Sequence, residues 1–145
     1  MRRLLESWAL VVAVAGLLAA HPAVLAAQSF AQGPSTIPAD EAREFLGAWN
    51  LGITGAQGES IDLSIDIEDR DGQVVAAVAA DGLSGAEPVS RIAREGERLT
   101  LSFMPVIQGQ PIPVRIGLTP RGEELNADIT AADGMFMASG TATRE

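Results

Sequence analysis

The sequence predicts an all-β protein: an eight-stranded antiparallel up-and-down barrel with a short N-terminal helical turn. Two observations carry this prediction. Turn clusters that contain glycine recur every 11 to 14 residues between Gly58 and Gly134, and Asp-Gly or Pro-x-Gly supplies the positive φ that tight hairpins require. Between the turns, apolar and polar residues alternate with the period of two that is typical of a half-buried strand. Seven such turns separate eight strands.

The expected strands differ in how clearly they alternate. The stretch 61–68 is the clearest, with isoleucine or leucine at every second position and acidic residues or serine between them. The stretch 74–80 is apolar on both faces, and we assign Val75 and Ala77 to the inside. In the stretch 89–94 the apolar residues lie three apart, which predicts a bulge or a short strand. The remaining expected strands are 49–53, 99–103, 112–119, 125–130 and 135–141.

A short helical turn is expected before the first strand. Pro38 suits a first helical position, acidic residues follow it, and Gly47 suits the stop. This turn is too short to cover a sheet, so the apolar faces of the strands must be buried against one another. Closure into a barrel achieves this and also removes exposed strand edges. An eight-stranded barrel is either filled by side chains or holds one small ligand.

The N-terminus predicts export. Residues 1–27 have a positive start, an apolar run and a small-residue exit, which are the marks of a secretory signal peptide. Residues 28–37 are polar and turn-rich and suggest a flexible leader, so the folded domain is expected at 38–145. The alternative is a retained membrane anchor, but the apolar run is shorter than the ~20 residues of a spanning helix. We therefore expect a periplasmic or secreted protein without stable membrane insertion, exported by either the general or the twin-arginine route.

Several residue types are missing from the sequence, and their absence limits the chemistry that the domain can perform. The chain has no cysteine and no tyrosine, its one histidine is His21 in the presumed signal, and every basic residue is arginine. Histidine bases, thiol nucleophiles, Schiff-base lysines and nearly all transition-metal sites are thereby excluded from the mature domain. We expect a non-enzymatic protein without cofactor or metal. The net charge of −9 also argues against nucleic acid as a partner.

The residues Phe45-Leu46-Gly47-Ala48-Trp49 read F-x-G-x-W and open the first expected strand. This pattern resembles the first signature of the lipocalin and calycin superfamily. The resemblance implies a small barrel in which Trp49 closes one end and an arginine from the chain terminus, here Arg144, packs on the indole. Phe45, Gly47, Trp49 and Arg144 are then barrel-closing structural residues. The second lipocalin signature and the usual C-terminal helix are missing, so the expectation is a calycin-like barrel.

The inward faces of the expected strands indicate what such a barrel would bind. They carry no charge, so any cavity would be lined by apolar groups and would suit a small apolar molecule. Whether the barrel is hollow or filled stays open. The candidate ligand-binding residues are Leu63, Ile65, Leu101, Phe103, Val114, Ile116, Ile129 and Phe136.

Two acidic clusters have residue types that chemical sites use. Asp62, Ser64 and Asp66 share one strand face, where a polar outer surface explains them more simply than acid–base chemistry. The acidic residues before Gly72 do not match the spacing of an EF-hand loop, and a solvated hairpin turn explains them.

The alternative function is a protein-interaction module, either similar to protease inhibitors or an accessory domain of a hydrolase. Periplasmic inhibitors with a calycin-like barrel also begin with a G-x-W strand, although they typically carry a disulfide that this chain cannot form. An inhibitor would use either the flexible leader before Thr36 or a loop such as 104–110. If residues 104–107, Met135 and Met137 are exposed, they would form an apolar surface for a partner.

Overall fold

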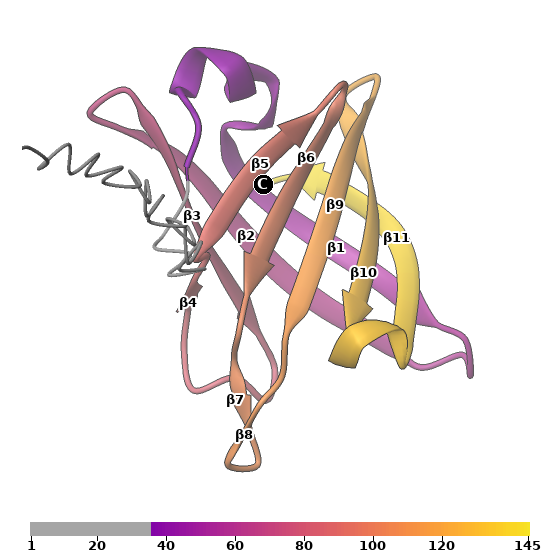
Figure 1. Ribbon diagram of the computed structural model, residues 1–145. Coiled ribbons are helices and arrows are strands. Elements are labelled where there is room, and N and C mark those ends of the chain that lie inside the picture. Colours follow the sequence, from indigo (N-terminus) through magenta and orange to yellow (C-terminus); the bar gives the residue numbers. More distant parts are fainter. Residues whose placement is uncertain (1–35) are drawn as a thin grey trace, which may run out of the picture. The chain divides into compact units, whose positions relative to one another are not determined.

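The computed structural model describes residues 36–145 of the chain. The predicted signal peptide and nearly all of the predicted leader lie outside these residues. The described part is built almost entirely of strands (Figure 1). Its elements are η1 (Ala39–Phe45), β1 (Gly47–Gly55), β2 (Ser60–Arg70), β3 (Gln73–Ala80), β4 (Glu87–Pro88), β5 (Arg91–Glu95), β6 (Arg98–Phe103), β7 (Val106–Ile107), β8 (Gln110–Pro111), β9 (Val114–Arg121), β10 (Glu124–Ala131), η2 (Ala132–Gly134) and β11 (Phe136–Arg144).

The strands form one curled antiparallel sheet in the order β4-β3-β2-β1-β11-β10-β9-β6-β5, with β7 and β8 as a separate small hairpin. Neighbours in the sheet follow one another along the chain, with two exceptions. β6 pairs with β9 across the β7–β8 hairpin, and β1 pairs with β11, from Trp49 opposite Arg144 to Gly55 opposite Ala138. The first and last strands are thus joined directly. This is an up-and-down meander of β-strands with a short 3-10 turn in front, and it confirms the predicted fold class.

The fourth predicted strand is split into two parts, and these parts pair with strands on opposite sides of the sheet. The amide of Val89 donates a hydrogen bond of 2.9 Å to Ala76 O at the edge of β3. The amide of the next residue, Ser90, donates one of 2.9 Å to Ser102 O in β6. The segment 87–95 therefore pairs with β3 through its first part and with β6 through its second. The irregularity expected in this stretch is the point where one partner is exchanged for the other.

The beginning of β3 is covered by the chain that precedes η1. Val74 N–H donates to Ile37 O at 2.9 Å, and Ala39 N–H donates to Gly72 O at 2.9 Å. The hydroxyl of Thr36 donates to Val74 O. The folded unit thus includes at least two residues upstream of the expected boundary at Pro38. From this edge η1 reaches β5, where Arg94 donates to Glu41 O and forms an ion pair of 2.8 Å with Glu44.

The core lies inside the curl of the sheet. The residues of the third predicted strand that point into it are not the ones assigned to the inside from the sequence. In β3 the buried side chains are Val74, Ala76 and Val78, whereas Val75 and Ala77 are only partly buried. An all-apolar strand carries no alternation from which its inner face can be read. The β2–β3 hairpin decides it, because Val78 lies opposite the buried Ile65 and Ala76 opposite the buried Ile67. Directly opposed residues share one face of the sheet.

Candidate functional site

One end of the barrel, here called the closed end, is sealed by η1 and two aromatic side chains. Phe45 and Trp49 are at most 2% exposed. The indole N–H of Trp49 donates a hydrogen bond of 2.8 Å to Phe45 O, so its polar group is satisfied although it is buried. The guanidinium carbon of Arg94 lies 5.6 Å from the centre of the Phe45 ring. The interior at this end is therefore packed, and the two aromatic rings serve as a structural plug.

Arg144 completes the closed end. Its guanidinium carbon lies 4.5 Å from the ring centre of Trp49, and its Nη1 donates a hydrogen bond of 2.8 Å to Leu46 O. Gly47 does not end the helix as expected. It opens β1 with a φ of +127°, and a Cβ on it would lie 2.7 Å from Arg144 Nη1. The structure thus brings Phe45, Gly47, Trp49 and Arg144 together in one cluster.

The opposite end, here called the open end, holds an apolar cavity of about 360 Å³. Six of the eight sequence-predicted ligand residues line it: Leu63, Phe103, Val114, Ile116, Ile129 and Phe136. The other two, Ile65 and Leu101, are fully buried and belong to the packed core rather than to the cavity wall. The interior is therefore filled next to the closed end and hollow at the open end.

Loops supply the part of the cavity wall that strand periodicity could not predict. Leu83 comes from the β3–β4 loop, and Pro105, Ile107 and Ile112 come from the segment around the β7–β8 hairpin. The hairpin is anchored by Ile112 N–H, which donates to Pro105 O at 2.9 Å. Asp81 is the single charged residue among the described residues that line the cavity. In the sequence, only the apolar stretch at 104–107 indicates that a loop contributes to this wall.

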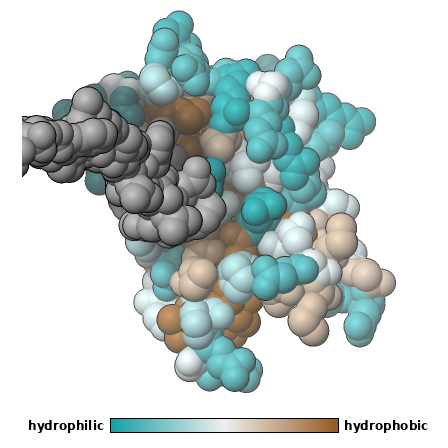
Figure 2. All heavy atoms as spheres, viewed as in Figure 1, coloured by the Kyte–Doolittle hydropathy of each residue, from teal (hydrophilic) through white to brown (hydrophobic). Residues whose placement is uncertain are grey.

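Exposed apolar side chains surround the open end. The exposed large apolar residues of 36–145 are Met104, Val106, Met135 and Met137, with exposures of 59%, 60%, 90% and 66%. All four stand on or beside the segments that line the cavity. Figure 2 shows apolar surface gathered at this end of the molecule, next to the hairpin and η2, with hydrophilic side chains over much of the remaining visible face.

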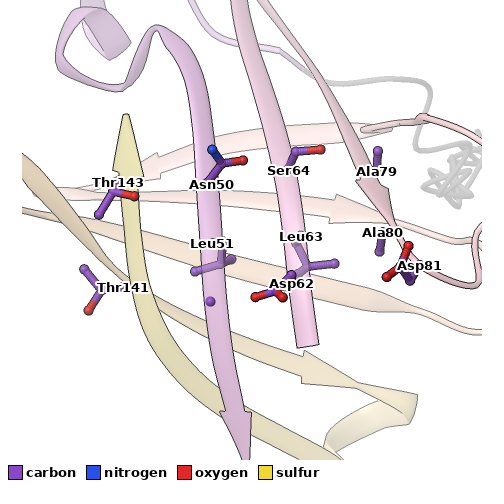
Figure 3. A pocket seen from close by; sticks show the side chains of 11 residues that line it. Asn50, Leu51, Asp62, Leu63, Ser64, Ala79, Ala80, Asp81, Thr141 and Thr143 are labelled. Atoms are coloured by element: carbon purple, nitrogen blue, oxygen red, sulfur yellow. The ribbon is translucent and has the colours of Figure 1, made fainter. Parts of the chain in front are cut away.

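A second concavity, here called the polar groove, lies on the outside of the barrel and has a volume of about 610 Å³ (Figure 3). It crosses β11, β1, β2 and the end of β3. Gly52 lies opposite both Thr141 and Asp62, and its missing side chain leaves the hollow between them. Asp62 and Ser64, which share the acidic strand face noted in the sequence, line this groove together with Asn50, Ala79, Asp81 and Thr143.

The acidic turn before Gly72 has a local structural role. Asp69 Oδ1 accepts a hydrogen bond of 2.8 Å from Gly72 N–H, and Glu68 forms an exposed ion pair of 3.2 Å with Arg70. No group of three or more His, Cys, Asp or Glu in residues 36–145 is placed to hold a metal ion. Across the same residues, no helix is long and apolar enough to cross a membrane.

Comparison with known proteins shows the fold alone. No protein-family model and no curated protein matches the chain. Among solved structures, a redesigned β-barrel bound to the small molecule DFHBI is similar, with a TM-score of 0.51 and 17% identity over 71% of this chain and 97% of that one. A de novo designed fluorescence-activating β-barrel has a TM-score of 0.49 and 14% identity over 75% of this chain and 99% of that one.

Proposed function

We propose that this chain is an exported, non-enzymatic, calycin-like barrel that binds a small apolar molecule in the cavity at its open end. The observation that carries the proposal is the cavity itself. A hollow of about 360 Å³ falls within the range of small-molecule sites, which are mostly apolar with few polar groups. Enclosing an apolar molecule there would remove its surface from water and would stabilise the complex in proportion to the area buried.

The walls of the cavity favour an apolar ligand over a polar one. Phe103, Phe136 and the branched aliphatic side chains offer no hydrogen bonds, so a polar ligand would lose its water contacts without replacement. The Asp81 carboxylate can accept a hydrogen bond from the end of a ligand. The redesigned barrel with a similar fold is described as bound to DFHBI, which supports a small molecule as the class of ligand. The F-x-G-x-W pattern at the closed end supports the calycin assignment.

The direct test is native mass spectrometry of the mature protein purified from its own host, followed by thermal-shift measurements with fatty acids and hydrophobic dyes. We expect an extra mass that disappears on denaturation, or a ligand-dependent rise in melting temperature. The variant Ala131→Leu places a larger side chain on the cavity wall and should reduce binding. The matched control is Ala79→Leu, which makes the same change in the polar groove and should bind as the wild type does.

A bare mass, no thermal shift and equal behaviour of the two variants would overturn the proposal. The same spectrum tests export, because the mature chain should begin near residue 28. An intact N-terminus at Met1 in protein recovered from the host's exported fraction would contradict the proposed signal peptide.

One observation favours a second candidate, a protein-interaction module. Met104, Val106, Met135 and Met137 leave apolar surface uncovered around the open end, and exposed apolar patches are typical of interaction sites. Under this reading the hairpin contacts a partner and the cavity stays empty. Replacing Met135 and Met137 with serine separates the two candidates, because it should abolish partner binding and leave the binding of a small molecule in the cavity nearly unchanged.

A further inference from the structure

Two arginines lie close together on the outer wall of the barrel, on strands that are distant in the sequence. Arg91 of β5 lies opposite Ser102 of β6, and Ser102 lies opposite Arg115 of β9. On the other side Arg115 lies opposite Thr130 of β10. These four residues form one row across four strands. They point outward, since neighbours such as Ile92 and Ile116 are buried in the core.

These arginines differ from most of the other cationic side chains of the described residues. Arg70, Arg94 and Arg98 form ion pairs with Glu68, Glu44 and Asp128, and Arg144 is held on Trp49. Within residues 36–145, neither Arg91 nor Arg115 has a carboxylate within ion-pair distance. Arg43 and Arg121 also lack such a carboxylate within these residues, so the feature that sets Arg91 and Arg115 apart is their placement on either side of one serine. Two like charges on either side of one serine repel each other, and an anion bound between them would offset that repulsion.

The surface between the two arginines is hollowed. Arg91, Ser102 and Arg115 line two adjoining grooves, of about 520 Å³ and about 340 Å³. Thr130 and Ser90 line the first, and Thr100 and Arg98 line the second. Each groove also has one carboxylate in its lining, Asp133 in the first and Glu95 in the second. The hydroxyl of Ser90 is already used, because it donates to Ser102 O at 2.9 Å.

We propose that Arg91, Ser102 and Arg115 form a binding site for a phosphate-type oxyanion on the outer wall of the barrel. Strands in a sheet are about 4.8 Å apart, so two arginines separated by one strand can converge on a single anion above the serine. Guanidinium groups bind phosphate with paired, charge-assisted hydrogen bonds, and the Ser102 hydroxyl supplies a third donor. The site is separate from the apolar cavity, which lies on the inner face of the same strands, and does not depend on the proposed function.

The test is an NMR titration of the full mature protein with inorganic phosphate at constant ionic strength, with chloride as the balancing anion. We expect saturable shifts of the Arg91 and Arg115 side-chain N–H signals and of the Ser102 amide, with a dissociation constant on the order of 1 mM. Arg91→Ala and Arg115→Ala should each weaken binding by about tenfold. Arg91→Lys should bind at an intermediate level, because it keeps the charge but loses the planar fork. The control Arg70→Ala, at an exposed ion pair, should bind as the wild type does.

Vesicles identify the natural form of the ligand. Co-sedimentation with phosphatidylglycerol vesicles but not with phosphatidylcholine vesicles, lost in Arg91→Ala, assigns the site to lipid head groups. Saturable phosphate binding without co-sedimentation assigns it to free phosphate compounds. Shifts that grow linearly, that chloride reproduces, or that persist in both alanine variants would overturn the site.

Discussion

The two ends of the barrel are built from the same strands but differ in how completely their apolar side chains are buried. At the closed end the aromatic side chains of Phe45 and Trp49 are buried, and the indole N–H of Trp49 donates a hydrogen bond of 2.8 Å. At the open end the strands run into loops, a small hairpin and η2, and methionines such as Met135 are up to 90% exposed. The difference predicts that folding stability depends mainly on the closed end and the proposed ligand binding on the open end. Substitutions at the closed end should reduce folding stability, whereas those at the open end should alter binding.

The largest expected effect is that of Trp49→Ala. The indole is 2% exposed and closes the barrel, so its removal should lower the free energy of unfolding by about 3–5 kcal/mol. The open-end counterpart is Phe136→Ala, which truncates a partly buried aromatic residue on the cavity wall and should cost clearly less. Urea denaturation of both variants makes the comparison. Equal losses would contradict the separation of stability and binding.

Most of the fold could be predicted from the sequence because alternation and turn glycines are local signals. The alternation in the strand 61–68 identifies its inner face. The all-apolar strand 74–80 has no such alternation, and only its pairing with β2 reveals that Val74 faces inward. Six cavity-lining residues could be named from the alternation along their strands. The loop residue Leu83 could not, since loop conformation has no periodicity. The proximity of Arg91 and Arg115 could not be predicted either, because it depends on the pairing of both β5 and β9 with β6.

A smaller loss of stability is expected for Gly47→Ala. Its φ of +127° is unfavourable for any side chain, and a Cβ would crowd Arg144 Nη1 at 2.7 Å. We expect a destabilisation of about 1–3 kcal/mol in chemical denaturation. Gly58→Ala is the control: its φ is +85°, but a Cβ there would meet nothing within 4 Å. If the two variants lose equal stability, the contact with Arg144 contributes nothing and backbone strain explains both.

Arg144→Ala should remove the cation–π contact and the hydrogen bond to Leu46 O. We expect a loss of about 1–2 kcal/mol in the free energy of unfolding. Arg144→Lys keeps the charge but not the planar group that stacks on the indole, and should recover only part of the loss. Full recovery by lysine would show that charge alone matters at this position. Ligand binding at the open end should stay at the wild-type level in both variants.

The smallest expected effect is a pH dependence that arises at the closed end. The pKa of Glu44 is lowered chiefly by a hydrogen bond from its own backbone amide; partial burial opposes this, and the Arg94 guanidinium lowers the pKa further. A carboxyl whose pKa is lower in the folded state stabilises the fold above its unfolded pKa. This stabilisation is lost as the pH falls through the folded pKa. Because the Glu44 side chain is 42% exposed, solvent screening should keep the effect below about 1 kcal/mol.

Denaturation between neutral pH and about pH 3 tests this prediction with two glutamine variants. Glu44→Gln should lower stability at neutral pH and make the acid-dependent loss shallower than in the wild type. The matched control is Glu68→Gln, which breaks the exposed ion pair with Arg70, at 3.2 Å and with side-chain exposures of 68% and 60%, and should follow the wild-type curve. If both variants follow that curve, the contact of η1 with β5 owes nothing to the charge of Glu44, and the closed end is held by its apolar packing and by the arginines on its aromatic rings.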